Sequence, residues 1–82
     1  MRLIQKSGPA DAITSTYAAN GSIIVNLKER WPQAVRFDTR ANELVISLDE
    51  KTTVRLRAAL PVIVDQLEIE KDQVTGRYRS LK

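Results

Sequence analysis

The sequence predicts an α+β domain: an antiparallel sheet of about five strands, packed on one face by a C-terminal helix. Apolar and polar residues alternate with period two through residues 34–57, which is typical of strands with one buried face. After this stretch, Pro61 and Gly76 occupy the positions expected at the two ends of a helix. We therefore predict a three-stranded meander over 34–57 and a helix over about 61–75, in a single domain of residues 1–82.

The first third of the chain is compatible with two structures. Asn20-Gly21 is a strong two-residue hairpin signal, and it lies between segments rich in β-branched residues. Alternatively, Pro9 and Gly21 could bound one helix, and residues 22–31 could form a second. We favour the hairpin for residues 9–31, because isoleucine, valine and threonine are poor choices for two short helices.

The apolar positions of the meander also predict its register, because residues opposite each other share a face. In the first hairpin the pattern sets Phe37 opposite Leu44 and, two residues on, Val35 opposite Ile46. In the second it sets Leu48 opposite Val54, with a three-residue loop. On the outward face this register puts Arg36, Val45 and Arg57 in one row and Ser47 beside Arg55.

The helix prediction has a competitor. The alternation in "LEIE" supports a chain that breaks near Lys71 into a short helix and a final hairpin. In either case "PVIV" places four apolar residues in succession, and a helix packed on one side leaves one of them, Val62, facing outward.

The residue types present in the chain limit the catalytic and metal-binding chemistry that it can perform. The chain has neither histidine nor cysteine, which excludes serine triads, cysteine nucleophiles and disulfides. The close acidic pairs, Asp49-Glu50 and Glu68 with Glu70, are typical of solvated surfaces rather than of a catalytic cleft. The glycines are scattered singly and the acidic residues lack calcium-loop spacing. We predict no enzyme activity, no cofactor and no metal site.

Charge is unevenly distributed along the chain. Residues 1–70 hold nine Lys/Arg and nine Asp/Glu, whereas residues 71–82 hold four and one. A flexible basic tail at 77–82 and the arginine-bearing sheet face are therefore candidates for contact with nucleic acid. For the tail we favour the simpler explanation, solvation of a chain terminus, and on the sheet face local pairing of Arg36 with Asp38 and Glu43 is the alternative. The candidate nucleic-acid-binding residues are Arg36, Arg55, Arg57, Lys71, Arg77, Tyr78, Arg79 and Lys82.

Three apolar residues point instead to a protein partner. Val62 and Val45 are expected at the surface, and Trp31 either caps the core, which we favour, or projects from it. A domain this small gains stability by self-association, so we expect a homodimer.

These features favour a small non-catalytic accessory or inhibitory protein, of the kind that mobile elements encode, which occupies a surface of a protein or nucleoprotein partner. The alternative is a nucleic-acid-binding protein. No apolar run approaches the length of a membrane helix and the start is too short in apolar residues for a secretory signal, so we expect a cytoplasmic protein without membrane contact.

Overall fold

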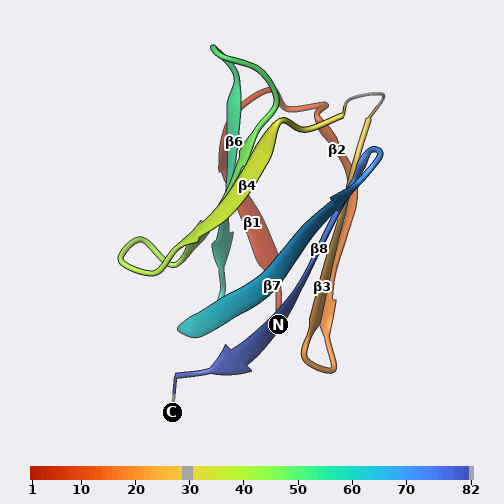
Figure 1. The fold of residues 1–82 in the computed structure, drawn as a ribbon. Helices are drawn as coiled ribbons and strands as arrows, with labels where there is room; N and C mark the ends of the chain where they lie inside the picture. The colour runs from red at the N-terminus through yellow and green to blue at the C-terminus, as the bar shows by residue number, and fades with distance from the viewer. Residues whose placement is uncertain (29–30, 82) are drawn as a thin grey trace.

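The computed structural model describes residues 1–28 and 31–81, and all of their regular structure is β-strand (Figure 1). The predicted α+β class is therefore wrong: the protein is all-β. Eight strands are present in this part of the chain: β1 (Leu3–Ser7), β2 (Ile13–Ala19), β3 (Ser22–Leu27), β4 (Ala34–Asp38), β5 (Glu43–Ser47), β6 (Thr53–Ala58), β7 (Val62–Glu70) and β8 (Gln73–Ser80).

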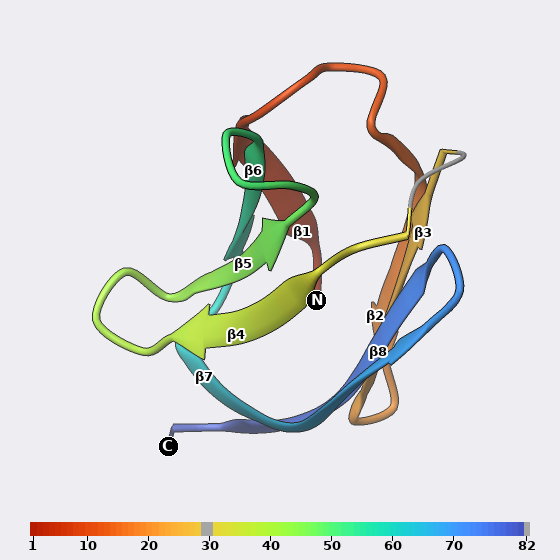
Figure 2. The same ribbon diagram turned by 45° about the horizontal axis from the view of Figure 1, so that its top comes forward.

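The strands form two four-stranded antiparallel sheets rather than one sheet of about five. Sheet A has the order β1-β6-β5-β4 and sheet B the order β2-β3-β8-β7. The two sheets face each other, with β4 beside β7 at one junction (Figure 2) and only a few contacts between β1 and β2 at the other. Sheet A therefore joins the meander to the N-terminal strand, and sheet B joins two hairpins that are far apart in sequence.

The core fills the space between the sheets, as expected when each sheet buries one face. Its most deeply buried side chains come from inward positions of both sheets: Ile23, Val25, Leu44, Ile46, Val54, Leu56 and Val74.

The N-terminal hairpin is confirmed. β2 and β3 pair in antiparallel register around Asn20-Gly21, where Asn20 has φ of 56° and Gly21 has φ of 77°. Positive φ at both central residues is the geometry that the twist of a two-residue hairpin requires, and asparagine and glycine are the residues that adopt it at least cost.

The meander is also confirmed, and so is the register of its first hairpin, with Val35 opposite Ile46 and Phe37 opposite Leu44. The predicted register of the second hairpin is wrong by two residues, because Ile46 pairs with Val54 rather than with Leu56. The connection has five residues instead of three. The Asp49 carboxylate closes it by accepting hydrogen bonds from the backbone N–H groups of Lys51 (2.8 Å) and Thr52 (2.7 Å).

The predicted C-terminal helix is wrong in both of its versions, because residues 62–80 form the β7–β8 hairpin. The register of this hairpin shifts between Asp65 and Glu68, where Gln66 has φ of 53°. A bulge inserts an extra residue, so the residues that follow it exchange their inward and outward positions. Val64 and Leu67 consequently lie on the same inward face although they are three residues apart, and this spacing imitates a helical repeat.

Gly76 has a different role from the predicted helix end. It lies buried in β8 opposite the bulge, and a Cβ atom at this position would stand 2.8 Å from Cδ2 of Leu67 and 3.3 Å from Cγ1 of Val64. Glycine suits this position because the bulged strand brings Leu67 down onto the backbone of β8, and a Cβ atom would force the Leu67 side chain to move.

One asparagine ties the two sheets together where β6 leads into β7. The Asn42 amide nitrogen donates hydrogen bonds to the carbonyl oxygens of Ala58 (3.1 Å) and Leu60 (2.9 Å), and its side-chain oxygen accepts one from the N–H of Val62 (3.2 Å). The residue sits in the β4–β5 turn with φ of 57°. Its side chain thus fixes the path of the chain from sheet A to sheet B.

Candidate nucleic-acid interface

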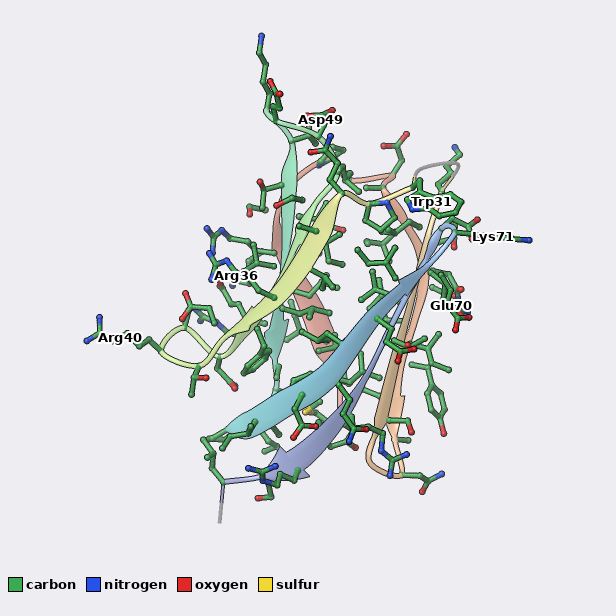
Figure 3. All side chains as sticks on the ribbon, viewed as in Figure 1. Trp31, Arg36, Arg40, Asp49, Glu70 and Lys71 are labelled. Atoms are coloured by element: carbon green, nitrogen blue, oxygen red, sulfur yellow. The ribbon has the colours of Figure 1, made fainter. Side chains whose placement is uncertain are left out.

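The outward face of sheet A brings three of the predicted arginines together. Arg36 on β4 and Arg55 on β6 stand on either side of Val45 on β5, and Arg57 stands opposite Glu43. The predicted row of Arg36, Val45 and Arg57 is therefore wrong. The two-residue shift in register places Arg55, and not Arg57, beside Val45. We call Arg36, Arg55 and Arg57 the arginine face; Arg36 is labelled in Figure 3.

A nearly buried carboxylate organises this face. Glu43 is 7% exposed, and its carboxylate oxygens lie 3.4 Å from Nη1 of Arg55 and 3.7 Å from Nη2 of Arg57. Burying a carboxylate is costly unless it is paired, so the two guanidinium groups account for the tolerance of this charge. In return, Glu43 restrains both arginine side chains on one side of the sheet.

Arg36 has no ion-pair partner among the described residues, contrary to the expectation that Asp38 and Glu43 pair with it. Asp38 instead accepts hydrogen bonds from the backbone N–H groups of Arg40 (3.0 Å) and Ala41 (3.2 Å), which closes the β4–β5 turn. Glu43 pairs with the arginines of β6. Arg36 is consequently the member of the arginine face that forms no ion pair with a carboxylate of the described residues.

The N-terminal strand adds to the face two residues that sequence reasoning missed. β1 pairs with β6, with Ile4 opposite Arg57, and a register irregularity places Lys6 next to Ser7 opposite Arg55. Both Ile4 and Lys6 are exposed. β1 was missed because Leu3 and Ile4 are apolar in succession although they point to opposite faces, so the segment shows no alternation.

The charge of the molecule is divided unequally between the two sheets. The segments that build sheet A and its hairpins, residues 1–8 and 34–60, contain seven Lys/Arg and four Asp/Glu. The segments that build sheet B, residues 9–28 and 61–81, contain four and five. The excess positive charge of the described chain therefore belongs to sheet A, although in sequence it seemed to belong to the C-terminus.

The basic C-terminal residues lie on the other sheet. Residues 77–80 are the end of β8, where Arg77 donates a hydrogen bond to Oγ of Ser22 (3.1 Å) and Arg79 pairs with Asp65 (3.1 Å). Tyr78 points inward and packs against the core, so its ring is not presented for base stacking.

Lys71 sits in the β7–β8 turn beside Glu70, on the side of the molecule opposite Arg36 and Arg40 (Figure 3). Lys82 lies outside the described residues. Lys71, Arg77 and Arg79 therefore do not share one surface with the arginine face.

Two of the three candidate protein-contact residues are buried. Val62 is 2% exposed because it is an inward residue of β7 rather than the outward residue of a helix, and Val45 is 3% exposed although it lies on the outward face. Arg36 and Arg55 flank Val45, and their long aliphatic stems are in position to cover it. Trp31 is 67% exposed, so the favoured core position for this ring is wrong.

The outward face of sheet B is polar and nearly neutral. Asn26 donates a hydrogen bond to Oγ of Ser15 (2.9 Å) and accepts one from the side chain of Gln73 (2.9 Å), which links three neighbouring strands. A shallow pocket of about 290 Å³ lies on the same sheet. Its lining residues include Ile24, Glu68, Thr75 and Arg77. This face offers hydrogen bonds but no concentration of charge.

Within residues 1–28 and 31–81, no group of three or more acidic, histidine or cysteine side chains is placed to hold a metal ion. The same residues contain no helix with the length and apolar content needed to cross a membrane. Comparison with known proteins found no matching family model, no similar curated protein and no similar solved structure.

Proposed function

We propose that this protein is a non-catalytic binding domain whose arginine face contacts the phosphate backbone of nucleic acid. The observation that carries the proposal is the convergence of Arg36, Arg55, Arg57 and Lys6 on one exterior sheet face, against the carboxylates of Glu43 at their centre and of Asp38 opposite Glu43. Guanidinium groups are well suited to phosphate oxygens because they present several N–H donors in a planar fork.

Two properties of the face support a polyanion over a single small anion. Its cations come from three different strands and spread over the sheet, so a ligand that meets them all must carry several negative charges. Arg36, Arg57 and Lys6 are also exposed to solvent, whereas small ligands are usually held in concave sites. A nucleic-acid backbone provides regularly repeated charge on an extended surface.

The proposal is tested by comparing two double variants that remove the same charge from different sheets. Arg36→Gln with Lys6→Gln alters the face on sheet A, and neither residue has an ion-pair partner in the described chain. Arg77→Gln with Arg79→Gln alters sheet B. Binding of a labelled oligonucleotide is measured by fluorescence anisotropy at stepped salt concentrations.

We expect the sheet A variant to weaken binding by about tenfold or more at low salt, because two phosphate contacts are lost, and the sheet B variant to change it by about twofold. An equal loss in both variants would show that only the overall charge matters. A loss confined to the sheet B variant would move the interface to β8.

A protein partner is the second candidate function, and the exposure of Trp31 favours it. A tryptophan that is 67% exposed buries little apolar area within its own chain, and tryptophan is one of the residues that most often dominate protein interfaces. Since the protein has a single tryptophan, its fluorescence reports on this position alone.

Light scattering with dilution tests whether a second copy is the partner. If it is, the emission of Trp31 shifts to shorter wavelength as the dimer forms, and Trp31→Ala leaves a folded monomer. A dimer that persists in Trp31→Ala would exclude this ring from the interface.

A further inference from the structure

We infer that the arginine face takes the phosphate backbone of a double helix and does not read bases; this inference rests on the proposed contact with nucleic acid. The first reason is where the aromatic rings lie. Proteins that bind single strands stack the unpaired bases on aromatic side chains, commonly on an open sheet face. The outward positions of sheet A carry no aromatic residue.

Each aromatic residue of the chain has a different place. Phe37 and Tyr78 are turned inward and pack against the core. Tyr17 is 45% exposed, but it stands on the outward face of sheet B, opposite Ile24. Trp31 lies in the connection between β3 and β4, outside both sheets. A single strand laid on the arginine face would therefore meet no ring on which to stack its bases.

The second reason is the width of the face. Four strands spaced about 4.8 Å apart give a sheet about 14 Å wide before its side chains are counted. The major groove of DNA is about 12 Å wide and admits a helix or a two-stranded ribbon. Sheet A cannot enter the groove face-on, so its arginines reach the phosphates at the groove edges and leave the base edges untouched.

The third reason is that part of the face is organised before any ligand arrives. Glu43 restrains Arg55 and Arg57 through contacts of 3.4 Å and 3.7 Å. These two residues alternate along one strand, about 6.7 Å apart, and Arg36 lies two strands away, about 9.6 Å from Arg55. The restrained pair of Arg55 and Arg57 suits the regularly spaced phosphates of a stiff duplex, because ordering the phosphates of a flexible single strand costs conformational entropy.

The experiment compares one duplex with each of its separated strands, and with a second duplex of unrelated sequence, all at the same phosphate concentration. Anisotropy titrations of the full-length protein at several salt concentrations give the affinity and its salt dependence. We expect the duplex to bind about tenfold more tightly than either strand. The two duplexes should agree within about twofold, because phosphates carry no sequence information.

The salt dependence gives an independent count of contacts. If Arg36, Arg55, Arg57 and Lys6 each neutralise one phosphate, the logarithmic slope for the duplex is about −3.6, at about −0.9 per contact. Arg36→Gln should reduce its magnitude by about one contact and weaken both duplexes equally. Arg79→Gln, on sheet B, is the matched control and should leave the slope unchanged.

The outcomes separate the two levels of the proposal. Single strands that bind as tightly as the duplex, or more tightly, overturn the assignment to a double helix and leave the arginine face as a nucleic-acid interface. A preference of more than about tenfold for one duplex sequence overturns recognition by phosphates alone. Absence of binding to every oligonucleotide at low salt overturns both the inference and the proposed function.

Discussion

The outward faces of the two sheets follow the same alternation of side chains and yet differ in chemistry. On sheet A, a glutamate that is 7% exposed lies beneath arginines, and Val45 beside it is as buried as the core. On sheet B, uncharged side chains link neighbouring strands, and the ion pair of Arg79 with Asp65 is open to solvent. Long arginine side chains can therefore act as a second cover over a sheet, so that β5 is buried on both of its faces.

This difference in charge distinguishes the exterior surfaces of the two sheets. A nearly buried carboxylate is costly unless it is paired, so Glu43 depends on the guanidinium groups above it, whereas the hydrogen-bonded side chains on sheet B hold no buried charge. The contrast places the search for a ligand on sheet A. It also yields three predictions about stability, each of which compares a residue of sheet A or its connection with a matched residue of sheet B.

The largest expected effect comes from the core side of sheet A. Ile46 is fully buried and faces Val35 and Val54, so Ile46→Ala should lower the free energy of unfolding by about 2–5 kcal/mol. Ile24 stands on the outward face of sheet B and is only half-buried, so Ile24→Ala should cost less than about 1.5 kcal/mol. Urea denaturation of both variants measures the difference, and similar losses would contradict the assignment of inward and outward faces.

The success of this assignment in the meander shows what the sequence alone can predict. Val35, Phe37, Leu44 and Ile46 alternate without interruption, and their register followed from the pattern. The second hairpin kept the correct faces but slipped by two residues, because Val54 has an apolar partner in either register. Alternation determines the face of a residue, but the geometry of the loop determines its partner.

The failures have equally specific causes. The bulge at Gln66 changed the phase of β7, so its inward residues acquired a helical spacing, and Gly76 resembled a helix end although it serves a close approach between strands. At the candidate site, the arginines were identified from alternation within the meander. Lys6 and the pairing of Glu43 were not, because they depend on β1 and on a register that no local pattern encodes.

The next prediction compares two asparagines that both adopt positive φ. Asn42 makes three side-chain hydrogen bonds across the connection from sheet A to sheet B, whereas the Asn20 side chain has one contact of 3.4 Å with the Tyr17 hydroxyl. Glycine tolerates both backbone conformations, so substitution by glycine isolates the side-chain bonds. Asn42→Gly should cost about 2 kcal/mol and Asn20→Gly less than about 1 kcal/mol.

Thermal and urea denaturation of the two glycine variants provide the comparison. If Asn42→Gly proves as mild as Asn20→Gly, the connection between the sheets is held by other contacts. A loss in Asn42→Gly that is accompanied by an unchanged denaturant slope shows that the fold is kept and only its stability is reduced.

The smallest expected effect concerns the two kinds of ion pair. Arg55→Met retains an apolar stem beside Val45 but removes the closer guanidinium from the nearly buried Glu43, whereas Arg79→Met removes an exposed partner from Asp65. We expect a loss of about 1–2 kcal/mol for Arg55→Met, since Arg57 alone still offsets the buried charge, and a change within about 0.5 kcal/mol for Arg79→Met. Adding Glu43→Gln to Arg55→Met should recover most of the loss, because the amide needs no cation. If the double variant is as unstable as Arg55→Met, the cost comes from packing over Val45, and the arginine layer stabilises sheet A by its stems rather than by its charge.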